Sequence, residues 1–214
     1  MNRRQISLRS LLWGMLFCGI ATAFAMNYRR MRIAEADLRQ LRREVGYLEP
    51  SGDDELAAVR VAVDEPLVWQ AKLRVPAKPR YRLAYSAVWP QAEAGPDWFA
   101  AQPLPEGESI VTVRVLKDPR DDQWRISTIV RNADGVRRMG TVLPDEISEV
   151  FRGTHDVISE GVGKQTVVRP AGQKLRLFDE RYFSGTALLL YGDRAPDTQM
   201  VGVFVELQPD IGTL

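Results

Sequence analysis

The sequence contains little of the chemistry on which metal sites and nucleophilic active sites depend. Cysteine occurs once, as Cys18, so neither an intrachain disulfide nor a cysteine-based metal site can form. Histidine also occurs once, as His155, and no G-x-S-x-G motif is present to place a serine nucleophile. A triad would need a distant serine, and neighbouring Asp156 rarely has the geometry to orient His155. The candidate serines are Ser148, Ser159 and Ser184. These absences favour a protein that is not an enzyme and uses no cofactor or metal ion.

Runs of basic residues, which nucleic-acid binding requires, are also missing from most of the chain. Residues 1–50 hold nine arginines and four acidic residues, for a net charge of +5. Residues 51–214 hold twenty basic and twenty-four acidic residues, for a net charge of −4. Because nucleic-acid affinity depends on clustered lysine and arginine, we predict no nucleic-acid partner.

Neither a complete phosphate-binding motif nor a complete calcium-binding motif is present. Residues 161–164 (GVGK) match part of a phosphate-binding loop, but Ile158 occupies the position of its first glycine and Gln165 that of its hydroxyl. The acidic pairs are dispersed, without EF-hand spacing: Asp53-Asp54, Asp121-Asp122, Asp145-Glu146 and Asp179-Glu180. A calcium site where two pairs meet remains an alternative, because the loops of a β-sandwich gather at its ends.

One long uncharged run is present, at residues 10–26. As a helix it is about 25 Å long, slightly less than a hydrocarbon core of about 30 Å. Aromatic and basic side chains suited to the membrane interface flank the run: Arg9, Trp13, Tyr28, Arg29 and Arg30. We therefore predict a basic tail at residues 1–9 and a transmembrane anchor at residues 10–28, with the lipid bilayer as partner.

Two alternatives to an anchor remain open. Ala23-Phe24-Ala25 fits the small-x-small pattern at which a secretory signal is cleaved, although the mature chain would then begin inside an arginine-rich helix. A buried helix of a soluble protein is less consistent, because the run is apolar on every face. Counting arginines on both sides slightly favours a cytoplasmic head, whereas the short basic start resembles a signal-anchor that exports it. We favour the extracytoplasmic side.

Apolar residues recur every three or four positions along residues 29–49. The members of this a/d pattern are Met31, Ala34, Leu38, Leu41, Val45 and Leu48. The pattern predicts an amphipathic spacer helix that pairs with a second copy as a parallel coiled coil, giving a homo-oligomer through residues 31–48. A single unpaired stalk, or a helix packed on its own domain, is the alternative. The helix should stop near Pro50, where a linker at residues 50–55 begins.

From residue 56 to residue 214 the apolar period changes from helical to two. Alternating runs occur near residues 57–63, 67–75, 80–88, 109–116, 123–131, 165–170, 173–179, 186–192 and 200–207. Asn132-Ala133-Asp134-Gly135 predicts a hairpin, and a short helix is expected after Pro144. The fold prediction is mainly β: an antiparallel sandwich of eight to ten strands, preceded by a transmembrane helix and a short coiled-coil-like helix.

Four stretches carry a resemblance to a known group of proteins. They are ISLRSLLWGMLFCGIATAF, LRREVGYLEP, EPLVWQAKLRVPAKPRYRL and VGVFVELQP. The chain resembles membrane-anchored planctomycetal bacterial proteins with an SLRTLL-type hydrophobic segment, a short Arg/Glu/Leu helix and a tryptophan-containing β domain. The resemblance implies the same layout. The group has no assigned activity, so no functional residue is transferred from it.

The proline-rich segment at residues 89–107 is the best candidate for ligand binding. Trp89, Trp98 and Phe99 could present aromatic faces to a sugar ring or a peptide, or could turn inward and cap the sandwich. Our preferred function is a membrane-tethered interaction or structural module with a protein or envelope partner. The alternatives are a carbohydrate- or small-ligand-binding domain that uses this segment, and a hydrolase whose site is assembled from separate loops.

Overall fold

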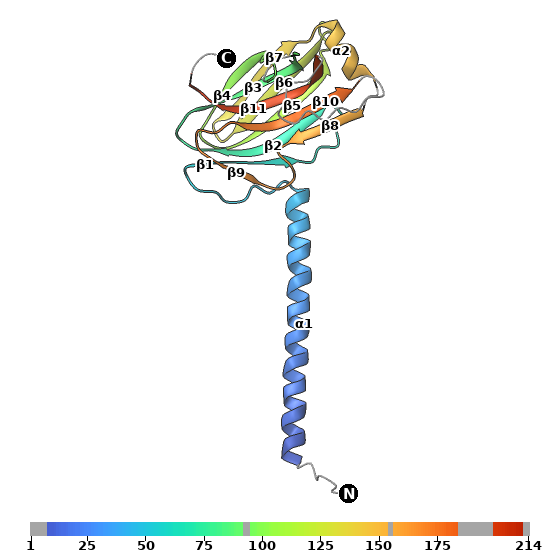
Figure 1. The fold of residues 1–214 in the computed structure, drawn as a ribbon, viewed down its shortest axis with the longest axis vertical. Coiled ribbons are helices and arrows are strands. Elements are labelled where there is room, and N and C mark those ends of the chain that lie inside the picture. Colours follow the sequence, from blue (N-terminus) through green and yellow to red (C-terminus); the bar gives the residue numbers. More distant parts are fainter. Residues whose placement is uncertain (1–7, 92–94, 154–155, 184–198, 212–214) are drawn as a thin grey trace. The chain divides into compact units, whose positions relative to one another are not determined.

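The computed structural model covers all 214 residues. Its described parts are residues 8–91, 95–153, 156–183 and 199–211. The chain divides into two compact units, Met1–Arg43 and Glu44–Leu214. In Figure 1 the first unit is helical, and the second consists mainly of strands.

The described residues of the first unit form one continuous helix, α1 (Leu8–Glu44), whose last residue belongs to the second unit. Its sequence contains no proline, and Gly14 and Gly19 lie among good helix formers that outweigh their low propensity. Glu35 and Arg39 form the ion pair expected from their four-residue spacing, with 3.9 Å between their charged atoms. The predicted anchor and the predicted spacer are therefore consecutive parts of one helix.

The helix ends at Glu44, five residues before the predicted end of the spacer. Gly46 has φ +57°, a left-handed conformation that commonly terminates helices and that glycine adopts without strain. A Cβ atom at Gly46 would lie only 2.8 Å from Cγ2 of Val61. The assignment of Val45 and Leu48 to the heptad seam is therefore wrong, because both follow the end of the helix.

The second unit contains two antiparallel sheets, as the sequence predicted. Sheet A has the strand order β7 (Gly135–Val142), β6 (Trp124–Asn132), β5 (Gly107–Lys117), β2 (Val68–Val75), β1 (Glu55–Val61) and β9 (Val167–Pro170). Sheet B has the order β4 (Ala100–Leu104), β3 (Tyr81–Trp89), β11 (Met200–Pro209), β10 (Leu175–Phe183) and β8 (Asp156–Gly161). The two sheets are visible as stacked arrows in Figure 1.

The main core lies between the two sheets. Side chains from both sheets form a single buried cluster, which includes Leu73 of sheet A and Tyr85 and Leu207 of sheet B. Along β2, buried and half-buried residues alternate without interruption, as a strand with one core face requires. The alternating runs expected at residues 109–116 and 123–131 form β5 and β6, and Val113, Ile126 and Thr128 of these strands are fully buried. The period-two pattern therefore identified the core side of these strands correctly.

Two strands lie where the sequence gave no strand signal. β4 occupies part of the segment expected to be a loop, and β8 covers a run that includes Asp156 and Glu160. Both are edge strands, where a proline such as Pro103 or a charged residue is tolerated because one side of the backbone is unpaired. The expected run at residues 186–192 lies outside the described residues.

The short helix expected after Pro144 is confirmed as α2 (Asp145–Arg152). Asp145 and Glu146 lie in its first turn, where acidic side chains complement the helix dipole. The predicted hairpin is also confirmed: β6 pairs with β7, and Gly135 has φ +143°. Phe151 of α2 contacts Tyr182 of β10 edge to face, with 5.0 Å between ring centroids.

Tyr182 gives the domain a specific sensitivity to alkaline pH. Burial and, secondarily, the negative charge of Glu180 raise the pKa of Tyr182 from its ordinary value of 10 to about 12. Between these values the folded chain holds a proton that the unfolded chain has lost, so the free energy of unfolding falls as pH rises from 10 toward 12. Denaturation with urea across this range should show a weaker fall for Tyr182→Phe than for the wild type. Tyr47→Phe, at an exposed position, is the control and should retain the wild-type slope.

Candidate functional site

The first candidate site is the apolar surface of α1. Every described residue of this helix is exposed, and it is long and apolar enough to cross a membrane. Trp13 is 56% exposed and Tyr28 is 49% exposed, and in this helix they are separated by about 22 Å along the axis. The hydroxyl of Thr22 donates to the carbonyl oxygen of Cys18 at 2.8 Å, so this polar group is satisfied within the helix. The alternative of a buried soluble helix is not supported.

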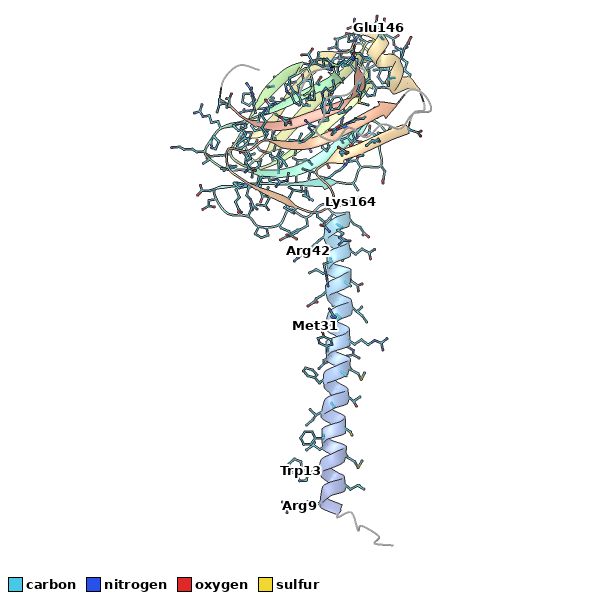
Figure 2. All side chains as sticks on the ribbon, viewed as in Figure 1. Arg9, Trp13, Met31, Arg42, Glu146 and Lys164 are labelled. Atoms are coloured by element: carbon cyan, nitrogen blue, oxygen red, sulfur yellow. The ribbon has the colours of Figure 1, made fainter. Side chains whose placement is uncertain are left out.

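The predicted interface residues lie at the two ends of the uncharged run. Figure 2 labels Arg9 and Trp13 near the start of α1, and Met31 and Arg42 farther along it. Tyr28, Arg29 and Arg30 follow the run, and the guanidinium of Arg32 lies 5.6 Å from the centroid of the Tyr28 ring. This arrangement places aromatic and cationic groups where a membrane interface would be, which agrees with the predicted anchor.

The second candidate site, the segment at residues 89–107, does not form the expected aromatic surface. Trp89 is fully buried in a small cluster with Met200 and Phe204, and Trp98 packs against this cluster. Phe99 packs instead against the main core. Trp89 therefore cannot present its face to a sugar, and its assignment as a ligand-binding residue is corrected by its burial.

Hydrogen bonds attach this segment to strand β3. The amide of Asp97 donates to the carbonyl oxygen of Val88 at 3.1 Å, and that of Phe99 donates to Tyr85 at 3.0 Å. The hydroxyl of Ser86 donates to the carbonyl oxygen of Asp97 at 2.5 Å. Trp98 and Phe99 are half-buried, so only part of each ring is accessible. The segment is better described as a cover over its own sheet.

A buried charge cluster surrounds Trp89 on β3 and β10. The guanidinium carbons of Arg176 and Arg181 lie 5.1 Å and 5.0 Å from the Trp89 ring centroid. Arg181 donates through two nitrogens to the Asp179 carboxylate, both at 2.7 Å, and Arg176 donates to the same carboxylate at 3.0 Å. Because Asp179 and Arg181 are buried, this pair is not accessible to a ligand, and each charge depends on the other for compensation.

Two of the three serines considered for catalysis lie in described parts of the chain, and both donate hydrogen bonds. Ser148 donates to the carbonyl oxygen of Asp145 at 3.0 Å, and Ser159 donates to the Glu180 carboxylate at 2.7 Å. His155 and Ser184 lie outside the described residues, so the hydrolase hypothesis stays a prediction. Within residues 8–91, 95–153, 156–183 and 199–211, no three His, Cys, Asp or Glu side chains lie together in a possible metal site.

The third candidate site is a cleft that sequence reasoning missed. It has a volume of about 690 Å³ and lies between residues 45–50, which we call the strap, and the outer face of sheet A. The strap is fixed to the domain at several points: Lys72 donates to the carbonyl oxygen of Val45 at 3.0 Å, and Thr166 donates to that of Tyr47 at 3.1 Å. Glu49 also donates its amide to the Thr166 hydroxyl at 3.0 Å.

The lining of the cleft is mixed in character. Apolar walls come from the strap and from β5, and cationic groups come from β2 and β6. The main lining residues are Val45, Leu48, Ile110, Lys72, Arg74 and Arg131. Arg74 is paired with Glu108 at 2.5 Å and donates to the hydroxyl of Ser51 at 3.1 Å. Alternation along the strands could have placed Lys72 and Arg131 on the outer face, but only the strand order makes them neighbours of one cleft.

In comparisons with known proteins, no family model, no curated protein and no solved structure matches the chain. The resemblance to the planctomycetal group therefore stays a prediction.

Proposed function

We propose that the protein is a single-pass membrane protein whose β-sandwich head is an interaction or structural module. The observation that carries this proposal is α1, whose uncharged run at residues 10–26 is exposed wherever it is described. Exposed apolar surface of this extent is unfavourable in water and is removed from water by a bilayer. The head is a separate compact unit with its own core, as an independent binding module requires.

The alternative functions receive less support from the geometry. A carbohydrate site would need exposed, co-planar aromatic rings, whereas Trp89 is buried and its neighbours are attached to β3. A hydrolase would need a nucleophile activated by a free base, whereas Ser148 donates to a backbone carbonyl oxygen. The carboxylate that accepts from Ser159 belongs to Glu180, and its charge is already paired with Arg60 at 2.7 Å. The interaction module therefore remains the preferred function.

Cysteine chemistry tests both the anchoring and the side of the membrane on which the head lies. In a Cys18→Ser background, a single cysteine is introduced by Lys164→Cys, in the exposed loop between β8 and β9, or by Arg9→Cys. We expect a membrane-impermeant maleimide to label Lys164→Cys in intact spheroplasts, and Arg9→Cys only after lysis. The opposite pattern would place the head in the cytoplasm. Recovery of the wild-type chain in the soluble fraction, beginning at Met26, would contradict anchoring and support the cleaved-signal alternative.

A further inference from the structure

We propose that the outer face of sheet A binds an extended acidic peptide segment of a partner protein at the cleft beside the strap. The proposal deepens the interaction function and rests on it. The surface consists of the strands β2, β5, β6 and β7. The partner is a peptide segment in which acidic and apolar side chains share one face.

The strand register brings cationic and apolar side chains into a single row on this face. Lys72 of β2 pairs with Ile110 of β5, and Ile110 pairs with Arg131 of β6. Core residues such as Leu73 and Val130 occupy the alternate positions of these strands, so the row faces outward. Neighbouring strands lie about 4.8 Å apart, so the two cationic residues flank the isoleucine at about that distance on each side.

The surface continues toward the sheet edge on β7. Val136 of β7 pairs with Arg131 and extends the first row, and in the next row Ile129 of β6 pairs with Arg138 of β7. Val136 is 50% exposed, although it is an apolar side chain on an edge strand. The surface therefore combines positive charge with accessible apolar area, as binding surfaces for amphipathic partners do.

The positive charge of this surface is neutralised at Arg74, by Glu108 of the same cleft, but not at its other cationic residues. Among the described residues, Lys72, Arg131 and Arg138 form no ion pair, whereas Arg74 is paired with Glu108. Residues 51–214 nevertheless carry a net charge of −4, so the acidic residues are concentrated elsewhere. A cationic patch on a domain of the opposite sign attracts a short acidic segment locally.

A peptide fits these observations better than a polyanion such as nucleic acid. Three unpaired cations separated by isoleucine and valine give a low charge density, whereas polyphosphate binding needs dense clusters. A long polyanion would also extend over the acidic remainder of the domain. In an extended peptide, alternate side chains share a face, so glutamate, leucine and glutamate at positions i, i+2 and i+4 match the order Lys72, Ile110 and Arg131.

The test uses the full chain in nanodiscs of neutral phosphatidylcholine and a fluorescein-labelled peptide, GSESLSESG. We expect fluorescence anisotropy to show binding that weakens as salt rises from about 0.05 M to 0.5 M, because the charges are exposed. The matched peptide GSQSLSQSG should bind about tenfold more weakly, because both charge contacts are removed. Both peptides are tested on the wild-type chain, and equal binding of the two would overturn the proposal.

Charge reversal locates the binding surface. The double variant Arg131→Glu/Arg138→Glu should lose about tenfold in affinity for the glutamate peptide, because attraction becomes repulsion at both positions, while the hydrogen bond by which Lys72 fixes the strap is kept. The control is Arg80→Glu/Lys164→Glu, which makes the same charge change at two exposed positions away from the cleft and should bind as the wild type does. Equal losses in the two variants would show a non-specific charge effect and would overturn the proposal.

Other occupants of the surface are distinguished in the same assay. Tighter binding of duplex DNA or heparin than of the peptide, lost in Arg131→Glu/Arg138→Glu, would replace the peptide by a polyanion and contradict the proposal. Binding to phosphatidylglycerol vesicles but not to the peptide would also contradict it, in favour of a lipid surface. Because the chain is already inserted in nanodiscs, a failure here leaves the anchoring result unaffected.

Discussion

Replacement of Asp179 by asparagine should lower the free energy of unfolding by about 3–5 kcal/mol, the usual cost of removing one partner from a buried ion pair. The side chains of Asp179 and Arg181 are 1% and 0% exposed, so water does not replace the lost carboxylate charge. Arg181 loses its bidentate acceptor, and Arg176 loses a partner at 3.0 Å. Because domains are stable by only about 5–15 kcal/mol, this loss is a large fraction of the total stability.

Urea denaturation of the full chain in detergent, followed by tryptophan fluorescence, measures the effect. Asp122→Asn is a matched control, because Asp122 makes an exposed ion pair with Lys117 at 2.6 Å and should show a much smaller loss. The double variant Asp179→Asn/Arg181→Met should be more stable than Asp179→Asn alone, because it removes the buried cation as well. Similar stabilities for Asp179→Asn and Asp122→Asn would contradict the assigned role of the cluster.

Two lysines in the centre of the uncharged run should release the protein from the membrane. Leu16→Lys and Ile20→Lys lie one turn apart on α1, and each charge at the middle of a span costs about 2.5–3.5 kcal/mol. Neither lysine can easily extend its ammonium group to the lipid headgroups, because both lie near the middle of the run and far from its ends. We expect the double variant to appear in the soluble fraction or to be degraded, while the wild type resists extraction with alkaline carbonate.

Leu38→Lys/Leu41→Lys is the control for this experiment. It places two lysines in the same helix, beyond the predicted span, so membrane retention should equal that of the wild type. The same variant tests the predicted coiled coil, since Leu38 and Leu41 are exposed members of the a/d pattern. A wild-type cross-linked dimer that this variant loses would support self-association. Membrane retention of Leu16→Lys/Ile20→Lys would contradict the anchor.

The sequence predictions were correct for features that depend on residues close together in the chain, and wrong for features that depend on distant ones. Apolar alternation in β2 and β5 depends on neighbours within each strand, and the faces predicted from it are correct. The helix end was placed too late because the heptad pattern continues through Val45 and Leu48, whereas Gly46, in a left-handed conformation, follows the last helical residue closely. A side chain at position 46 would collide with Val61, a residue that is distant in the sequence.

The edge strands and the aromatic segment show the same limit. β4 and β8 are strands because their neighbours β3 and β10 offer unpaired backbone groups, although their own residues have weak strand propensity. Trp89 is an aromatic residue in a proline-rich segment, as a ligand-binding residue would be. In the folded domain, however, its ring packs against Arg176, Arg181 and Phe204. Burial of this kind depends on strand order, which alternation along one strand does not encode.

The amino-acid sequence alone determined the uncharged run, the change from helical to strand periodicity and the mainly β fold, because each depends on local spacing. The tertiary structure alone decided that Lys72, Ile110 and Arg131 form one row, and that Asp179 and Arg181 are buried against Trp89. The physical reason is that strand order and register are selected by packing across the whole core. A side chain's neighbours on adjacent strands are therefore a property of the fold.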